Sequence, residues 1–323
     1  MTAATHVVLG GNGVVGRETL RALVAAGHTP TSVGRHPTNV DGVVPLVADL
    51  LDHDDVHRAL RGADVAYLVA GLPYSSRVWA RQWPVILDNV AAVAAEQGTH
   101  LVYLDNVYAY GPVDGPMTED TPVRPGGRKG RVRAAALDLL ARAAARGVDV
   151  TVGRSADFYG PGATTSVFNG FVLDKVAAGR RSTWLYDADQ PHSLTYTPDI
   201  GRALTVLGTD DRARGRTWHL PTAPALTGRQ YVRTAVDVAA GTTAPADVPL
   251  GVMSSTTMRI GALFITSARE TLELSYQYRA PYVFDSTAYE TTFGVSPTPV
   301  VDGITASLAA ARPTASSRTA SLS

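Results

Sequence analysis

The glycines near the N-terminus have the spacing of an anion-binding turn. Gly10, Gly13 and Gly16 follow the apolar residues 7–9 and lie where a helical pattern begins at Val14. In such a turn the first glycine permits a tight bend, the second lets the backbone approach a phosphate, and the third lets the helix pack on the strand. Free amide groups and the positive helix end would then bind a pyrophosphate, so we expect a bound dinucleotide. The residues expected around it are Gly10, Asn12, Gly13, Val14, Val15 and Gly16.

The second apolar run indicates which dinucleotide binds. Residues 31–33 are followed by Gly34, Arg35 and His36, where a carboxylate would bind the ribose hydroxyls of NAD. A guanidinium instead pairs with a 2′-phosphate. We therefore favour NADP(H), with NAD(H) as the alternative. Arg35 could equally be a solvated surface arginine.

Composition excludes several classes of protein. The 323 residues carry 29 basic and 29 acidic side chains, so no field favours nucleic acid or anionic lipid. There is no cysteine, which removes disulfides and thiolate chemistry, and no His/Asp cluster suggests a metal. The N-terminus lacks the pattern of a secretory signal, and no run approaches the roughly 20 apolar residues that cross a bilayer. We expect a cytoplasmic protein with a small-molecule substrate and neither nucleic acid nor membrane as partner.

Strand and helix patterns alternate through the first half of the chain, which predicts a parallel sheet with helices on both faces. The expected strands are residues 7–9, 31–33, 43–47, 65–69, 101–104 and 148–152. The expected helices are 14–26, 78–97 and 131–146, each closed by a glycine, namely Gly27, Gly98 and Gly147. We place the core at 1–155, with 190–220 returning to it, a substrate lobe at 156–189 and 221–312, and a flexible tail at 313–323.

Several segments resemble the NAD-dependent epimerase/dehydratase family, the extended and atypical short-chain dehydrogenases/reductases. Besides the glycines, they are residues 48–50 (Ala-Asp-Leu), 69–71 (Val-Ala-Gly), 101–111, 154–162 and 196–200. The resemblance spans about residues 5–220 and implies a Rossmann-type doubly wound parallel sheet, in the α/β class, with a smaller C-terminal substrate lobe. It also implies that Asp49, Leu50, Ala70 and Gly71 contact the cofactor.

The catalytic pair of most relatives is missing. They use a serine and a Tyr-x-x-x-Lys motif, in which the lysine helps the tyrosine to exchange a proton. Here Pro125 stands four residues before Lys129, and Phe171 four before Lys175. The resemblance aligns Asn106 with the serine.

The same alignment puts Lys129 at the tyrosine and Arg133 at the lysine. We expect Asn106 and Lys129 to polarise a carbonyl, with repulsion from Arg133 lowering the pKa of Lys129, which can still donate a hydrogen bond, and with Arg133 lying at the nicotinamide ribose. Whether Lys129 also donates a proton to the substrate is open. Alternatively, this helix carries only solvated charges.

Other polar side chains follow expected strands. We assign substrate contact to Tyr74, Tyr108 and Asp157 and a catalytic role to Tyr159. The plainer alternatives are aromatic packing for the tyrosines and a turn cap for the aspartate. His192 could carry a proton but is more often a surface-loop histidine.

Three functions agree with these features. The first is an NADP(H)-dependent oxidoreductase or epimerase-like enzyme acting on a small organic substrate, such as a sugar derivative or an intermediate of natural-product biosynthesis. The second is a non-redox enzyme on the same scaffold, catalysing cyclisation, dehydration or isomerisation. The third is a non-catalytic NADP(H) sensor. By analogy with the family, residues 78–97 and 131–146 could form a homodimer interface.

Overall fold

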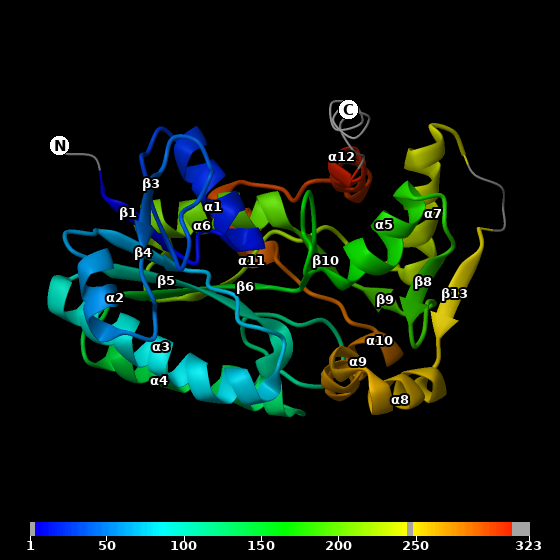
Figure 1. Ribbon diagram of the computed structural model, residues 1–323, viewed down its shortest axis with the longest axis horizontal. Helices are drawn as coiled ribbons and strands as arrows, with labels where there is room; N and C mark the ends of the chain where they lie inside the picture. The colour runs from blue at the N-terminus through cyan, green and yellow to red at the C-terminus, as the bar shows by residue number, and fades with distance from the viewer. Residues whose placement is uncertain (1–3, 244–247, 312–323) are drawn as a thin grey trace, which may run out of the picture.

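The computed structural model describes residues 4–243 and 248–311. At its centre lies a parallel sheet with the strand order β11-β6-β5-β4-β1-β2-β3 (Figure 1). This arrangement confirms the expected α/β class and the doubly wound sheet. The strands are β1 (His6–Leu9), β2 (Thr31–Gly34), β3 (Val44–Val47), β4 (Val65–Leu68), β5 (His100–Asn106), β6 (Val150–Ser155) and β11 (Thr217–His219).

Helices cover both faces of this sheet and bury its central strands. Every residue of β1 and β4 is buried, as expected for strands packed on two sides. One face packs on α1 (Val14–Ala25) and α6 (Thr197–Thr209). The other face packs on α2 (His53–Ala59), α3 (Ser76–Gln97) and α4 (Arg128–Ala145).

Three helices end at the glycines that the sequence indicated. Gly27, Gly98 and Gly147 all have positive φ angles, of 87°, 68° and 97°. A residue with a Cβ rarely adopts this conformation, so these glycines stop α1, α3 and α4. The structure places the starts of α3 and α4 two to three residues earlier than the pattern predicted.

A smaller lobe packs beside the carboxyl ends of the strands, to the right in Figure 1. Its core is aromatic, with Phe168, Trp184 and Tyr231 in contact with one another. Its strands are β7 (Asp157–Tyr159), β8 (Ser182–Leu185), β9 (Pro191–His192), β10 (Leu194–Tyr196), β12 (Leu226–Thr227) and β13 (Leu250–Met253). Its main helices are α5 (Asp174–Ala177), α7 (Gly228–Ala240), α8 (Ser255–Phe264), α9 (Thr266–Thr271), α10 (Tyr276–Arg279) and α12 (Val300–Ala311).

The chain returns from the lobe to the sheet twice. In the first return, α6 packs on α1 and β11 extends the sheet beside β6. The second is α11 (Thr287–Phe293), whose Tyr289 and Phe293 pack on Trp218 of β11. Part of the range expected as lobe, 221–312, therefore lies against the core. The expected tail, 313–323, lies outside the described residues. Within those residues, no helix has the length and hydrophobicity needed to cross a membrane.

Candidate active site

The N-terminal glycine turn contains close backbone contacts that only glycine permits. Gly10 has a φ of 99°, and a Cβ there would lie 2.5 Å from the Cα of Ala70. A Cβ at Gly16 would overlap the carbonyl oxygen of Gly10. Helix α1 begins after Gly13 with no side-chain cap and no acidic residue in its first turn. Its first amide groups, including those of Val14 and Val15, can therefore bind an anion.

The expected ribose and adenine contacts lie along the same sheet edge. The side-chain amide of Asn12 donates a 2.5 Å hydrogen bond to the His36 carbonyl and so holds the turn after β2. Arg35 in that turn is exposed, and within residues 4–243 and 248–311 it has no ion-pair partner. Asp49 is exposed after β3, where its carboxylate accepts from the Leu51 amide at 3.0 Å. The remaining predicted contacts follow β3 and β4 and are Leu50, Ala70 and Gly71.

Two tyrosines that were predicted to bind substrate meet beyond the strand ends. Tyr74 follows β4, and Tyr108 lies in the short helix η1 (Val107–Ala109) after β5. The Tyr108 hydroxyl donates to the Tyr74 hydroxyl, and burial raises the pKa of both well above the ordinary tyrosine value. Both phenols therefore keep their protons at neutral pH.

Helix α4 fits closely against η1 at this point. A Cβ at Gly130 would lie 2.5 Å from the Tyr108 carbonyl oxygen, so the glycine permits the close approach. The approach brings Lys129, the neighbour of Gly130, to the Tyr74 ring, with 4.3 Å between the ammonium nitrogen and the ring centroid.

Asn106 ends β5 and offers one free polar group. Its Oδ1 accepts a 3.0 Å hydrogen bond from the Tyr108 amide and so caps η1. Its Nδ2 has no partner among the described residues. The Nδ2 group can donate to a carbonyl oxygen, so the expected role of Asn106 stays a prediction.

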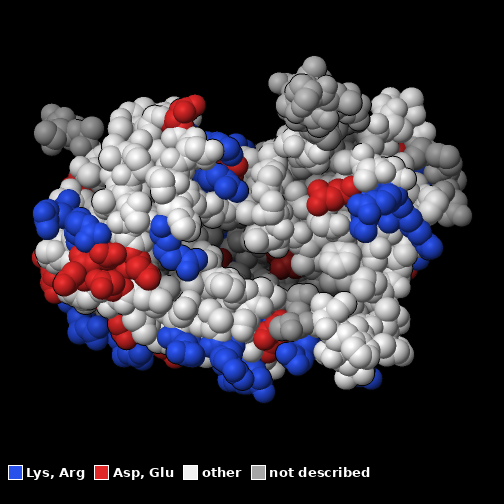
Figure 2. Space-filling model, in the orientation of Figure 1, with Lys and Arg blue, Asp and Glu red and all other residues white. Residues whose placement is uncertain are grey.

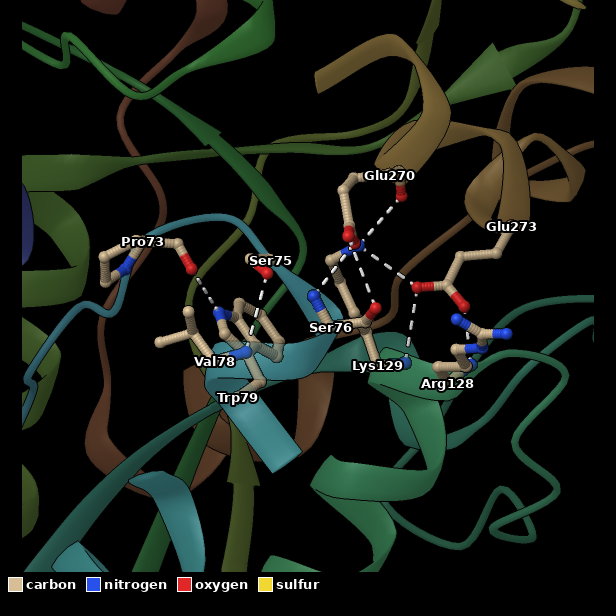
Figure 3. A network of polar contacts seen from close by, with 9 residues as sticks. All are labelled: Pro73, Ser75, Ser76, Val78, Trp79, Arg128, Lys129, Glu270 and Glu273. Carbon is tan, nitrogen blue, oxygen red and sulfur yellow. Dashed lines mark hydrogen bonds and ion pairs between the residues drawn. The ribbon is translucent and has the colours of Figure 1, made fainter. Parts of the chain in front are cut away.

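Lys129 lies at the centre of a polar network between α4 and the lobe (Figure 3). Its side chain is fully buried. The ammonium nitrogen lies 2.5 Å from Glu270 Oε2, 2.8 Å from the Glu270 carbonyl and 3.1 Å from Glu273 Oε1. These acceptors match its three hydrogens, so none remains for a carbonyl substrate in this arrangement.

The same two glutamates cap two helices. Glu270, in α9, accepts from the Ser76 amide at 2.9 Å, and Glu273, in the short helix η4 (Leu272–Leu274), accepts from the Arg128 amide at 2.5 Å. Negative charge at a helix N-terminus is stabilised by the helix dipole. Burial alone would raise the pKa of Glu270, but the bonds from Lys129 and Ser76 bring it below the ordinary value.

Arg133 points into the core, which corrects the expected repulsion with Lys129. Its guanidinium carbon lies 4.5 Å from the Trp83 ring centroid, and its NH1 donates to the Tyr103 hydroxyl. Lys129 instead meets two carboxylates, because the lobe covers the start of α4. Contact of Arg133 with the nicotinamide ribose stays a prediction.

A buried chain of hydrogen-bonded polar groups connects β5, β6 and β11 near their carboxyl ends. The Asp105 carboxylate accepts from Arg154 Nε at 2.9 Å, Arg154 donates to the Tyr110 hydroxyl, and that hydroxyl lies 2.7 Å from His219 Nε2. Burial, with the nearby Arg154 charge, lowers the pKa of His219 to about 3. His219 is therefore neutral in the folded protein at neutral pH.

The structure separates Tyr159 from Asp157, although they are two residues apart. Tyr159 is buried in the lobe core between Phe168 and Tyr196, as the packing alternative predicted. Asp157 lies 3.2 Å from Nε2 of His192. The expectation of a surface histidine is wrong, because His192 is only 1% exposed.

Figure 2 shows a hollow between core and lobe, near the centre of the face that it presents. Asp157 lies near Tyr74 and Tyr108, because its charge adds to the effect of burial in raising the pKa of both hydroxyls. Sequence reasoning missed Glu270 and Glu273, since more than 140 residues separate them from Lys129.

Known proteins share this architecture. The UDP-glucuronic acid 4-epimerase of Bacillus cereus, solved with UDP-glucuronic acid and NAD, superposes with a TM-score of 0.77 at 15% identity, covering 95% of this chain and 98% of that one. A double mutant of dTDP-glucose 4,6-dehydratase from Streptomyces venezuelae, with NAD bound, gives 0.74 at 19% identity, covering 94% and 96%. A nucleoside-diphosphate-sugar epimerase from Pseudomonas aeruginosa gives 0.72 at 22%, covering 95% and 97%.

Sequence comparison agrees with the fold. No curated protein matches the chain. The model of the NAD dependent epimerase/dehydratase family matches residues 6–220, two thirds of its length. The glycine turn, the strand order and this match lead to one conclusion: the chain belongs to the NAD dependent epimerase/dehydratase family.

Proposed function

We propose that this chain is an NADP(H)-binding enzyme that acts on a small organic substrate, a sugar derivative or a natural-product intermediate, by carbonyl reduction or epimerase-like chemistry. The observation that carries the proposal is the uncapped start of α1 beside the glycine turn. Backbone amides at such a place bind a pyrophosphate without a side-chain cation. A bound nicotinamide would supply hydride transfer.

Arg35 supports the choice of NADP(H). It follows β2, where relatives that bind NAD use an acidic residue, and its guanidinium is exposed. The Asn12 side chain holds this turn close to α1. A 2′-phosphate on the adenine ribose would therefore meet a positive charge, whereas the ribose hydroxyls of NAD would lack a carboxylate partner.

The substrate would bind at the hollow beyond β4, β5 and β7. Tyr74 and Tyr108 supply aromatic surface with hydroxyls that stay protonated, and Asn106 Nδ2 supplies a hydrogen-bond donor for a substrate oxygen. Lys129 acts as a positioning residue, because its ion pairs hold α9 and η4 against α3 and α4. Asp157 faces the same space from the lobe.

A non-redox reaction is the second candidate. It is favoured by the loss of the Tyr-x-x-x-Lys pair and by the saturated hydrogen bonds of Lys129. The same pocket would then direct isomerisation, dehydration or cyclisation, with the dinucleotide as a structural component.

Binding and turnover test these proposals together. NADPH and NADH are first titrated into the protein. The protein is then assayed, with NADP⁺ and with NADPH, on three sugar nucleotides that similar structures contain or are named after: UDP-glucose, UDP-glucuronic acid and dTDP-glucose. Tighter binding of NADPH with cofactor-dependent turnover supports the first candidate. Turnover that is unchanged on exchanging NADP⁺ for NADPH supports the second. Nucleotide binding that alters affinity for a protein, with no turnover, would identify a sensor.

A further inference from the structure

Asp157 and His192 meet because the lobe strands pair in register. Asp157 opens β7, which lies parallel to β10 with Leu194 opposite Asp157. His192 lies in β9, two residues before Leu194, and is therefore close to Asp157 at the start of the β7–β10 pair. The Nε2 atom of His192 lies 3.2 Å from Oδ2 of Asp157, at hydrogen-bond distance.

Both partners of the His192 ring are hydrogen-bond acceptors. Nδ1 lies 3.1 Å from the carbonyl oxygen of Gln277, which can only accept, so Nδ1 carries a hydrogen. An ionised carboxylate also only accepts. A neutral ring would therefore turn a bare Nε2 toward Oδ2, with no hydrogen between them. The contact requires one more proton than a neutral histidine and an ionised aspartate would hold.

The surroundings favour that proton on the ring. His192 is stacked between Tyr278 and Tyr282, with centroid separations of 4.5 Å and 4.8 Å, and aromatic faces attract a cation. The Tyr278 hydroxyl already donates to Asp157 Oδ2 at 3.2 Å, as it would to a carboxylate. These contacts set aromatic faces against the ring and a hydroxyl donor on the carboxyl oxygen.

Asp157 keeps one oxygen for a ligand. Oδ2 is taken by His192 and Tyr278, whereas Oδ1 has no hydrogen-bond partner in the described part of the chain. The Asp157 side chain is 20% exposed and that of His192 only 2%. A substrate can reach the carboxylate but not the imidazole.

Neighbouring groups are poor proton acceptors. The tyrosine hydroxyls around Asp157 have pKa values raised by burial and then by the Asp157 charge, so they stay protonated at neutral pH. The Lys129 ammonium is neutralised by Glu270 and Glu273, which cap helices. Among the residues that the structure describes, the titratable groups facing the pair are Tyr278 of α10 and Tyr282, with Tyr74, Tyr108 and Tyr276 facing Asp157.

We propose that Asp157 is the catalytic base of this site and that His192, as an imidazolium, is the positioning residue that orients it. The proton of a substrate hydroxyl passes to Oδ1: the substrate O–H bond breaks and an O–H bond forms on the carboxyl group. A bound oxidised nicotinamide would accept the hydride that leaves the same carbon. In the reverse direction Oδ1–H returns the proton to the carbonyl oxygen. This inference rests on the proposed function, and it supplies the base that the missing Tyr-x-x-x-Lys motif would provide.

The protonation of His192 is tested by ¹⁵N NMR of the imidazole nitrogens at neutral pH, in the full chain without nucleotide. His192→Gln identifies the resonances by their loss. We expect hydrogens on both ring nitrogens in the wild type and in Asp174→Asn, a matched control on exposed α5, but only on Nδ1 in Asp157→Asn. Unchanged resonances of the other histidines establish that the variant is folded. A bare ring nitrogen in wild-type His192 would overturn the proposal.

The catalytic role is tested on the substrate that turns over. We expect Asp157→Asn to lower kcat by about a hundredfold or more, the usual loss for a general base, with little change in KM. His192→Gln keeps a donor to Asp157 but no charge, so a smaller loss with an altered pH profile is expected. Wild-type kcat in Asp157→Asn would refute the role. If the protein binds no dinucleotide, the proposed function is wrong, but the NMR result on the protonation of His192 still holds.

Discussion

Replacing Lys129 by methionine tests whether this lysine holds the lobe on the core. The substitution keeps most of the apolar stem and removes the charge, leaving Glu270 and Glu273 beside each other without a cation. Removing one partner of a buried ion pair costs about 3 to 5 kcal/mol. Because the two glutamate side chains are 15% and 20% exposed, water rehydrates them in part, and we expect the low end, about 3 kcal/mol.

The assay is urea unfolding, with the free energy of unfolding compared across variants. Lys175→Met, at the other lysine of the chain, is the matched control and should change stability by less than about 0.5 kcal/mol. Adding Glu270→Gln and Glu273→Gln to Lys129→Met should restore about half of the loss or more, since no unpaired charge remains. A loss below about 1 kcal/mol in Lys129→Met, or a triple variant no more stable than the single one, would refute this reasoning.

Three further predictions concern other parts of the chain. His219 has a pKa of about 3 in the folded protein, whereas its ordinary value is 6.5, so between these two pH values it gains a proton when the chain unfolds. The free energy of unfolding should therefore fall as the pH drops from 6.5 toward 3, and should fall less in His219→Gln. Equal pH slopes of the wild type and the variant in urea unfolding would contradict this. Arg35→Asp should weaken NADPH binding at least tenfold and leave NADH binding equal or tighter in calorimetry. An equal loss of affinity for both nucleotides would contradict a contact between Arg35 and the 2′-phosphate. The groove of about 730 Å³ between α3 and α4 is predicted to be a homodimer face. Because Ala135 lines this groove, Ala135→Trp should yield monomers in light scattering, and a monomeric wild type would contradict the predicted dimer.

That groove is also rich in arginine. Basic side chains gather along the lower edge of Figure 2, over α3 and α4. Those that line the groove are Arg77, Arg128, Arg131 and Arg142, with Asp88 as an acidic neighbour. If the predicted dimer forms here, its affinity should rise with salt, because added ions screen the like charges of the two copies.

Much of the fold could be predicted because it depends on local patterns. Strands buried on both faces appear as apolar runs, and glycine at a positive φ marks helix ends such as Gly98. Helix α2 was missed because seven residues are too few to show periodicity, and β11 because it has three. The nearness of Tyr74, Tyr108 and Asp157 was predictable, since carboxyl ends of parallel strands share one edge.

The rest of the site depends on contacts between distant segments. Glu270 and Glu273 reach Lys129 only because the lobe packs across the start of α4, which no local pattern records. His192 looked like a loop residue beside a proline, yet Tyr278 and Tyr282 bury it from 86 and 90 residues further along the chain. Contacts between side chains of the core and the lobe, or between distant segments of the lobe, are therefore what the sequence predicted least well.

The central claim is that a dinucleotide pyrophosphate binds the amide groups at the start of α1. Calorimetric titration of NADPH and NADH into the wild type and into Gly16→Ala tests it most directly, because a methyl group at this position would overlap the Gly10 carbonyl oxygen. We expect saturable binding to the wild type, tighter for NADPH, and loss of at least about tenfold in affinity in a folded Gly16→Ala variant. No heat of binding for either nucleotide at millimolar concentration, or equal affinity in the variant, would contradict the account.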